Sequence, residues 1–300
     1  MTAVKTFDPT GWNLAEAVRI KGDRTISVCI PCRNEAQTVG DLIRMIEPVL
    51  VGTLVDELIV LDDDSTDGTG EIAAEAGATV IPVDYIHFFH GAAKGKGNAL
   101  WASLLASTGD IVVWIDGDIT SFTTDWIVRL VMPLLLDDEL GLVKANYERP
   151  SHLGGGGRTT ELVARPLLSM YFPKIADMQQ PLAGEFAGRR TMLEAIPFAT
   201  GWGVEIGMLI DMVEKFGLQS LGQVDLGVRL HRHHKLETLA IQAAEVAATL
   251  MQRVSQPPAF AEPVPMLHRK EHDPLQLNIG VRPPIDSLPK LGQTPSSERK

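Results

Sequence analysis

The chain has 300 residues, of which 45% are hydrophobic, and its formal net charge is -11. This length is enough for one large core or two fused ones, and the acidic surface excludes general nucleic-acid binding, which requires basic groups. No run approaches eighteen uninterrupted apolar residues, and the first residues show no export signal. We therefore expect a soluble, cytoplasmic protein that binds neither membranes nor nucleic acid.

Strand and helix signals alternate in the first half of the chain. Four β-branched apolar runs predict strands at Ile26–Ile30, Glu57–Leu61, Thr79–Val83 and Asp110–Ile115. Segments of helical period separate them at 36–49, 68–76 and 97–106. Such an alternation predicts an α/β fold with a doubly wound, mostly parallel sheet, on which ligands bind beyond the carboxyl ends of the strands.

The second half predicts strands at 140–148 and 224–230 and helices near 160–170, 204–216 and 236–254. We expect this half to cover the carboxyl edge of the sheet. The predicted organisation is an N-terminal extension (1–24), a nucleotide-sugar-binding half (25–146), an acceptor-binding half (147–254) and a tail (255–300). Nine of the nineteen prolines lie in the tail, so we expect it to be extended or disordered, and dispensable beyond about Leu267.

The two cysteines, Cys29 and Cys32, form a single C-x-x-C sequence at the end of the first predicted strand. A redox pair should open a helix, and a zinc site should show a second pair of ligands at the required spacing. Neither is present in the sequence. We interpret the pair as two thiols at a strand end.

Asp116, Gly117 and Asp118 follow the apolar run IVVWI directly. The glycine allows the backbone to turn, so both carboxylates can lie at the strand end. Oxygen ligands of this kind suit Mg²⁺ or Mn²⁺, which would neutralise a departing nucleoside diphosphate. His231, which follows the strand predicted at 224–230, is a candidate to complete the coordination of a metal held by Asp118.

Two further polar loops follow the first and second predicted strands. The loop DDDSTDGT (62–69) contains the helix caps Ser65 and Asp67, but a further aspartate at the strand end is available to a base or a ribose. The loop PCRNEA (31–36) supplies polar groups at the same edge. The loop 62–69 is compatible with a metal loop, a nucleotide-binding loop or only the N-cap of the next helix, and its spacing is not that of an EF-hand.

Two glycine-rich segments precede helices and predict anion sites. Lys94 and Lys96 lie in KGKG, where ammonium groups and backbone N–H groups point to one place, although the spacing is not that of a Walker loop. Arg158 and Thr160 follow the glycines 154–157 and offer a guanidinium fork and a hydroxyl group. Two anion sites in an acidic protein suggest two phosphorylated ligands, a donor and an acceptor.

With these residues identified, the chain resembles the glucosyl-3-phosphoglycerate synthases and the related mannosyl-3-phosphoglycerate synthases, which are retaining glycosyltransferases of the GT-A fold. The resemblance spans about Thr25 to Val254. It rests on ISVCIPCRNEA, DELIVLDDDSTDGT, KGKGNALW, GDIVVWIDGDI, GGGGRTTELVARPLL, QPLAGEFAGRR, GWGVEIGMLIDM and LGVRLHRHH.

The resemblance implies a role for individual residues. Those placed around the nucleotide sugar are Pro31, Cys32, Arg33, Glu35, Asp63, Lys96, Asp116 and Gly117. The metal would be bound by Asp118 and His231, and the phosphate and carboxylate of 3-phosphoglycerate by Gly157, Arg158 and Thr160. Glu205 would hydrogen-bond the transferred sugar and Arg229 would lie beside the leaving diphosphate. We also expect a homodimer.

The resemblance implies transfer of a sugar to the 2-hydroxyl of 3-phosphoglycerate with retention, giving an α-linked product. A carboxylate at Asp63 accepts from uracil or from guanine, so UDP-glucose, GDP-glucose and GDP-mannose are all compatible donors, and we expect UDP-glucose. Retention through a covalent carboxylate adduct would use Glu205 as nucleophile, and the alternative is same-face attack, which we favour.

Three other classes of protein share part of the pattern. A sugar-phosphate nucleotidyltransferase should show a glycine- and arginine-rich loop in place of PCRNEA. A polyprenyl-phosphate glycosyltransferase needs a membrane-seeking helix. A catalytically silent sugar-nucleotide-binding protein is expected to lack the carboxylate pair that ends in Asp118.

Overall fold

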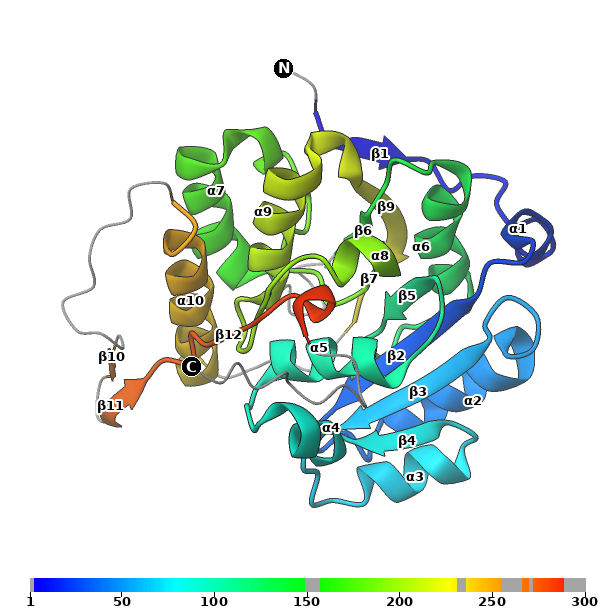
Figure 1. The fold of residues 1–300 in the computed structure, drawn as a ribbon, viewed down its shortest axis with the longest axis horizontal. Helices are drawn as coiled ribbons and strands as arrows, with labels where there is room; N and C mark the ends of the chain where they lie inside the picture. The colour runs from blue at the N-terminus through cyan, green and yellow to red at the C-terminus, as the bar shows by residue number, and fades with distance from the viewer. Residues whose placement is uncertain (1–2, 149–156, 231–235, 255–265, 270–271, 289–300) are drawn as a thin grey trace, which may run out of the picture.

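A central eight-stranded sheet organises the protein in the computed structural model, which describes residues 3–148, 157–230, 236–254, 266–269 and 272–288 (Figure 1). The strand order is β1-β9-β6-β7-β5-β2-β3-β4. All neighbours pair in parallel except β7, which is antiparallel to both β5 and β6. The predicted α/β class with a mostly parallel sheet is confirmed.

The four strands predicted in the first half are present at nearly the expected bounds. They are β2 (Ile26–Cys32), β3 (Glu57–Asp62), β4 (Thr79–Pro82) and β5 (Ile111–Trp114). The three predicted crossover helices are α2 (Val39–Leu50), α3 (Thr69–Glu75) and α5 (Lys96–Ala106). Because β2, β3 and β5 run in parallel, their carboxyl ends meet at one edge of the sheet.

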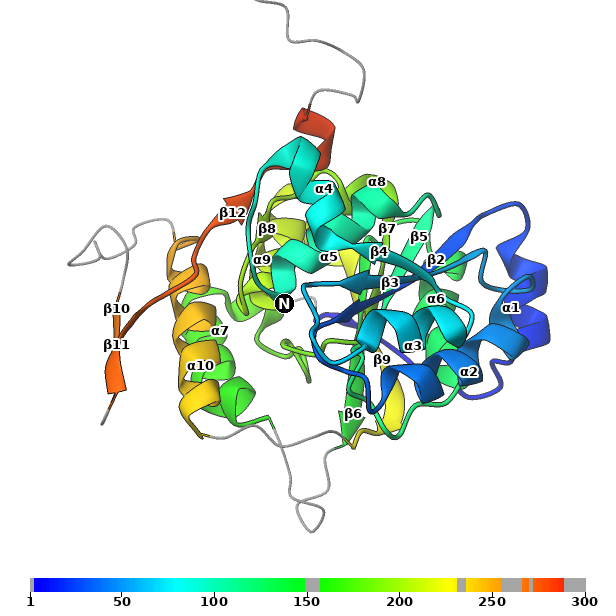
Figure 2. The same cartoon turned by 90° about the horizontal axis from the view of Figure 1, so that it is seen from below.

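The sheet buries an apolar core on each face. Alternate side chains of one strand point to opposite faces, so Val28 and Ile30 of β2 belong to one core and Cys29 to the other. Figure 2 shows α2 and α3 on one side of the central strands and α4 (Val83–His90) and α5 on the other. This three-layer arrangement leaves the ends of the strands for ligands.

The second half completes the same sheet. It contributes β6 (Leu142–Glu148), β7 (Phe186–Arg189) and β9 (Leu221–Val228), of which β6 and β9 were predicted. The predicted helices are present as the π-helix η2 (Thr160–Ala164), α7 (Arg165–Tyr171), α9 (Val204–Phe216) and α10 (Leu236–Met251). Short elements connect them: η3 (Pro173–Ile175), α8 (Arg190–Leu193), β8 (Phe198–Ala199) and η4 (Leu218–Ser220).

Several elements were not predicted. Besides α4 and β7, these are β1 (Lys5–Phe7), α1 (Leu14–Lys21) and α6 (Asp125–Leu136). Nine of the twelve residues of α6 are buried, so it lacks the polar stripe that gives an amphipathic helix its period. The division that set residues 1–24 apart is corrected, because β1 pairs with β9 in the sheet and α1 packs on α6.

The expectation of an extended or disordered tail is also corrected for the tail residues that the structure describes, because some of them pack on the body. The described tail residues form β10 (Met266–Arg269), β11 (His272–Gln276), β12 (Val281–Arg282) and the 3₁₀ turn η5 (Ile285–Ser287). β12 pairs antiparallel with β8, and Ile285 and Leu288 pack against the core of the body. The prolines prevent the segment from building its own core, but they do not prevent it from packing on an existing one.

Within the described residues, no helix is both long and apolar enough to cross a membrane.

Candidate active site

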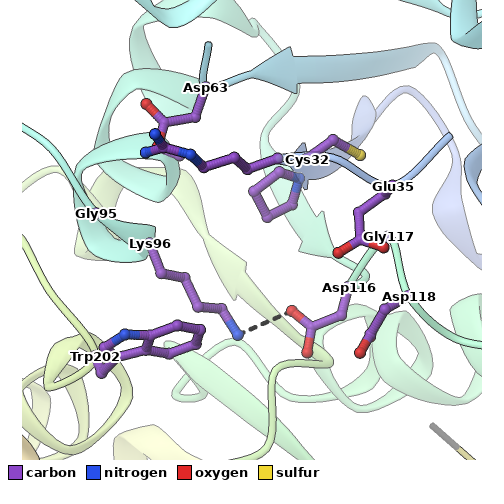
Figure 3. Close-up of a pocket in the computed structure, with 12 residues that line it drawn as sticks. Cys32, Glu35, Asp63, Gly95, Lys96, Asp116, Gly117, Asp118 and Trp202 are labelled. Atoms are coloured by element: carbon purple, nitrogen blue, oxygen red, sulfur yellow. Dashed lines mark ion pairs between the residues drawn. The ribbon is translucent and has the colours of Figure 1, made fainter. Parts of the chain in front are cut away.

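The carboxyl edge of the sheet contains a cavity of about 420 Å³ (Figure 3). It is lined by residues that end β2, β3 and β5 or begin α5, together with Trp202 from the loop before α9. All eight residues predicted to bind the nucleotide sugar line it, and so does Asp118. The lining residues are Pro31, Cys32, Arg33, Glu35, Asp63, Gly95, Lys96, Ala99, Asp116, Gly117, Asp118 and Trp202.

Two glycines make room for the aspartates beyond β5. A Cβ atom at Gly117 would lie 2.8 Å from the Cys32 sulfur, so the chain can pass β2 closely only without a side chain at this position. A Cβ atom at Gly184 would collide with the carboxylate of Asp116. Backbone packing therefore fixes where Asp116 lies, in addition to the charges around it.

Lys96 is the first residue of α5 and extends into the cavity towards Asp116 (Figure 3). Its Nζ atom lies 2.8 Å from Oδ1 of Asp116 and 2.9 Å from Oε1 of Glu205. Burial lowers the pKa of Lys96, but the two carboxylates outweigh this effect and raise the pKa above its ordinary value. The ammonium group is therefore charged and held in one position.

Arg229 follows β9 and approaches the same aspartates from the opposite side. Its Nη2 atom lies 3.1 Å from Oδ2 of Asp116, 3.6 Å from Oδ1 of Asp118 and 2.9 Å from Oε1 of Glu185. The side chain is only 5% exposed and Glu185 is fully buried. Burial raises the pKa of Asp116, but Lys96 and Arg229 more than offset it and hold the pKa below its ordinary value.

Lys144 lies behind this cluster, fully buried on β6. It donates a hydrogen bond to the carbonyl of Ala183, and its Nζ atom lies 4.2 Å from the centre of the Phe186 ring. Burial lowers the pKa of Lys144 to about 8, although the carboxylate of Glu205 opposes the shift. Four carboxyl groups (Asp116, Asp118, Glu185 and Glu205) and three basic groups (Lys96, Lys144 and Arg229) thus cluster at the inner end of the cavity and directly behind it.

The outer end of the cavity contains a looser pair. Arg33 Nη1 lies 3.5 Å from Oδ2 of Asp63, with the two side chains 50% and 13% exposed. Burial raises the pKa of Asp63, and the charge of Arg33 opposes this. The cap predicted at Ser65 is not formed, because the N-cap of α3 is Gly68 and the Ser65 hydroxyl accepts from the Asn34 amide instead. Asp67 accepts from the amide of Thr69, the first residue of α3.

The predicted acceptor residues lie at a helix start, as expected from the glycine run. Arg158 is the first helical residue, and the amide of Glu161 donates to the carbonyl of Gly157 at 2.9 Å. Arg158 is exposed and Thr160 is buried. None of Gly157, Arg158 and Thr160 is among the described residues that line the cavity, so their assignment to the acceptor stays a prediction.

A divalent metal fits the chemistry of the donors at the end of β5. Asp116 and Asp118 offer carboxylate oxygens, the ligands that Mg²⁺ and Mn²⁺ prefer. Among the residues that the structure describes, no three His, Cys, Asp or Glu side chains converge to form a complete site. The predicted ligand His231 lies outside the described residues. A partial set of protein ligands is what a metal that also binds phosphate oxygens requires.

The two cysteines are free, buried thiols in β2, as interpreted from the sequence. Burial raises the pKa of Cys29 to about 12 and that of Cys32 well above its ordinary value. Neither thiol therefore forms a reactive thiolate at neutral pH.

The sequence pattern did not single out Glu185, Lys144, Gly184 or Trp202. Lys144 lies among apolar residues in the run LVKAN, and a lysine in such a run was the available signal of a buried charge. Glu185 and Gly184 precede β7, a four-residue strand that is too short for a periodic pattern. Only the fold shows that these residues lie next to Asp116 and Arg229.

This sheet, with strand-end aspartates and two cations beside a nucleotide-sized cavity, defines a glycosyltransferase of the GT-A fold. The sequence profile described as "Glycosyl transferase family 2" matches residues 27–199. The chain is 45% identical over 264 residues to the glucosyl-3-phosphoglycerate synthase of Mycolicibacterium paratuberculosis, covering 85% of this chain and 80% of that protein. It is 39% identical to the synthase of Petrotoga mobilis, covering 96% of this chain and 95% of the relative.

Comparison with solved structures leads to the same family. The glucosyl-3-phosphoglycerate synthase of Mycobacterium tuberculosis in complex with Mn²⁺, UDP-glucose and phosphoglyceric acid superposes with a TM-score of 0.88 at 41% identity, over 95% of this chain and 99% of that one. The same enzyme with Mg²⁺ and UDP gives a TM-score of 0.85 over 94% and 98% of the two chains. The chain belongs to glycosyl transferase family 2 and, within it, to the glucosyl-3-phosphoglycerate synthases.

Proposed function

We propose that the protein transfers glucose from UDP-glucose to the 2-hydroxyl of 3-phosphoglycerate, with retention, and releases UDP. The observation that carries the proposal is that Lys96 and Arg229 both form ion pairs with Asp116, at the end of the cavity that Lys96, Asp116 and Asp118 line. The bound UDP-glucose and phosphoglyceric acid of the M. tuberculosis synthase support the choice of donor and acceptor.

The leaving diphosphate is the centre of the proposed chemistry. Breaking a sugar–phosphate bond places negative charge on the diphosphate, so cations fixed beforehand lower the barrier more than groups that must move. Lys96 and Arg229 are such cations, because buried carboxylates hold each of them in place. Asp118 and His231 would hold Mg²⁺ or Mn²⁺, which supplies further counter-charge when bound.

Glu205 is proposed to hydrogen-bond the transferred glucose. Its side chain is 5% exposed, and Oε1 lies 2.9 Å from Nζ of Lys96. A carboxylate that is neutralised by a lysine is a poor nucleophile, so this ion pair supports same-face attack over a covalent adduct. In that route the departing phosphate accepts the proton of the acceptor hydroxyl.

Arg158, Thr160 and the amide groups that follow Gly157 are proposed to bind the phosphate and carboxylate of 3-phosphoglycerate. The helix start supports this assignment, since its N–H groups and dipole attract anions. Arg158 is exposed, so its guanidinium group is accessible to a soluble acceptor.

A cytoplasmic location and a homodimer complete the proposal. Both rest on the family resemblance. Light scattering of the purified protein tests the second, with a mass of twice 32.6 kDa as the expected result and a mass of 32.6 kDa as the contradiction.

The reaction is tested by incubating the protein with Mg²⁺ or Mn²⁺, 3-phosphoglycerate and, in separate reactions, UDP-glucose, GDP-glucose, ADP-glucose or GDP-mannose. Mass spectrometry identifies the product, and NMR gives its anomeric configuration and the position of the linkage. We expect an α-linked glucosyl-3-phosphoglycerate from UDP-glucose. A β-linked product, or a mannosyl product formed faster than the glucosyl one, would contradict the proposal.

A further inference from the structure

The tail contains a segment, Leu277–Arg282, that we call the C-terminal strap. Leu277 is buried and β12 pairs with β8, so the strap lies on the body and not beside it. Figure 1 shows β12 between α10 and α5. Hydrogen bonds connect the strap to both helices: the amide of Asn278 donates to Oε1 of Glu245 on α10, and Arg282 Nε donates to Oδ1 of Asn98 on α5.

The strap contacts two loops that contribute to the cavity, Lys94–Gly97 and Thr200–Gly203. The side-chain amide of Asn278 donates to the carbonyl of Lys94 at 2.7 Å. The hydroxyl of Thr200 lies 2.7 Å from Oδ1 of Asn278, and the amide of Thr200 donates to the carbonyl of Gly280 at 2.9 Å. One asparagine therefore joins both loops.

Glu245 forms the second connection. One carboxylate oxygen accepts from the amide of Trp202 at 2.8 Å, and the other accepts from the amide of Asn278 at 3.1 Å. The side chain is buried, so these N–H groups partner a charge that would otherwise be costly to bury. Glu245 thus fixes the Trp202 loop and the strap relative to α10.

Glycines allow these chain segments to approach closely. A Cβ atom at Gly95 would lie 2.7 Å from the carbonyl oxygen of Thr200 and 2.9 Å from Nδ2 of Asn278. A Cβ atom at Gly97 would collide with the carbonyl of Ala199, and one at Gly201 with Glu245. Backbone contact this close transmits the position of one loop to the next.

The opposite side of these loops faces the cavity. Gly95, Lys96 and Trp202 line it, and Figure 3 shows the Trp202 ring beside the Lys96 side chain. We propose that Asn278 and Glu245 are positioning residues that clamp the two loops and so place the ammonium group of Lys96 on the donor diphosphate. This inference rests on the proposed function for the role of Lys96. It also reverses the expectation that the segment after Leu267 is dispensable.

The test compares Asn278→Ala and Glu245→Gln with the wild-type protein and with Asp211→Asn. Glutamine keeps the shape of Glu245 but cannot accept both N–H groups, so it remains informative if the alanine variant fails to fold. Asp211 forms a partly buried bidentate pair with Arg253, just past the end of α10, at 2.8 and 2.7 Å. Its variant weakens a contact of α10's C-terminal end without touching either loop.

Amide hydrogen exchange reports on the clamp alone. The amides of Gly97, Asn98 and Trp202 are expected to exchange at least about tenfold faster in Asn278→Ala and in Glu245→Gln. The reason is that local opening of the two loops costs less free energy when the contacts of Asn278 or Glu245 are lost. Asp211→Asn should leave these three amides unchanged while lowering the melting temperature. Unchanged exchange in the strap variants, or equal acceleration in the control, would overturn the proposal.

Calorimetric titration with UDP and UMP reports on the consequence. Asn278→Ala and Glu245→Gln should each raise the Kd of UDP by roughly fivefold or more and the Kd of UMP by less than about twofold. UMP is affected less because it lacks the second phosphate of the diphosphate that Lys96 is proposed to contact. Equal losses for both nucleotides would overturn the positioning role. If the wild-type protein binds neither UDP nor GDP, the proposed function is contradicted. The exchange rates still test separately whether Asn278 and Glu245 hold the two loops.

Discussion

The two ends of the cavity differ in how firmly their charges are held. At the inner end, ion pairs of 2.8 to 3.1 Å join Lys96 to Asp116 and Glu205, and Arg229 to Asp116 and Glu185, and three of these side chains are at most 5% exposed: Glu185, Glu205 and Arg229. At the outer end, Arg33 and Asp63 are 3.5 Å apart and half of the guanidinium side chain is exposed. Charges buried in fixed pairs cannot rearrange cheaply, whereas an exposed pair contributes little and adapts easily.

The difference suggests that the two ends of the cavity have different roles, which we call the division of labour: the inner end stabilises the diphosphate and the outer end selects the base. The inner end is organised before the substrate arrives, which is what stabilising a developing diphosphate charge requires. At the outer end Arg33 and Asp63 are held more loosely, so we expect the choice of donor to depend on groups that can be substituted without unfolding the protein. The predictions below test this division, from the largest expected effect to the smallest.

Asp118→Ala should cause the largest loss, at the inner end. We expect turnover to fall by roughly 10³-fold or more, about 4 kcal/mol, because the leaving diphosphate loses its metal counter-charge. Circular dichroism should show an intact fold. Asp41, an exposed aspartate on α2, serves as the control, and Asp41→Asn should keep normal turnover. Wild-type turnover in excess chelator, or an active Asp118→Ala, would disprove the role of Asp118.

Arg158→Ala tests whether the acceptor site is separate from both ends. The apparent KM for 3-phosphoglycerate should rise about 30- to 150-fold, roughly 2–3 kcal/mol, because a bidentate guanidinium–anion contact is lost. Steady-state kinetics should show little change in the KM for UDP-glucose, and Arg158→Lys should not restore the wild-type value.

Arg44→Ala is the control for Arg158→Ala, since Arg44 is an exposed arginine on α2 that pairs with Asp41. It should leave both KM values unchanged. If Arg158→Ala raises the donor KM instead, the two anion sites have been assigned in the wrong order.

Lys144 makes the inner end sensitive to pH. Its pKa is about 8 in the folded protein, against 10.5 for an ordinary lysine, so between these values the unfolded chain binds more protons than the folded one. Stability from this group therefore rises with pH across that window. Relative to Lys144→Met, the wild-type protein should gain roughly 1–3 kcal/mol between pH 7.5 and 10.5, measured by urea unfolding. A difference that does not vary with pH would contradict this.

The sequence predicts most of what surrounds the donor, because the relevant groups follow strands. Asp63, Asp116 and Asp118 come directly after apolar runs, and parallel strands bring such ends together. Lys96 was predicted from the glycines that open its helix. For these residues the local pattern predicted a place at the edge of the sheet, and the family resemblance supplied the proposed roles.

The remaining parts depend on packing that no local pattern records. Glu185 reaches Arg229 only because β7 inserts antiparallel between β5 and β6, and a four-residue strand has no detectable period. Asn278 lies in a proline-rich stretch whose composition predicts disorder, yet it packs on a core built by other elements. The composition of a segment indicates whether it can form a hydrophobic core of its own. It does not indicate whether the segment packs on a core formed by the rest of the protein.

The central claim is that the inner end of the cavity binds the diphosphate and the outer end selects the base. The most direct test is to titrate UDP and GDP, with Mg²⁺, into the wild-type protein, Lys96→Met and Asp63→Asn, and to measure each Kd by calorimetry. Lys96→Met should weaken both nucleotides by about tenfold, because each loses the same contact to its diphosphate. Asp63→Asn should change the ratio of the two Kd values by about fivefold, because uracil and guanine present different donors to the lost carboxylate. A change of ratio in Lys96→Met, together with equal losses in Asp63→Asn, would contradict the account.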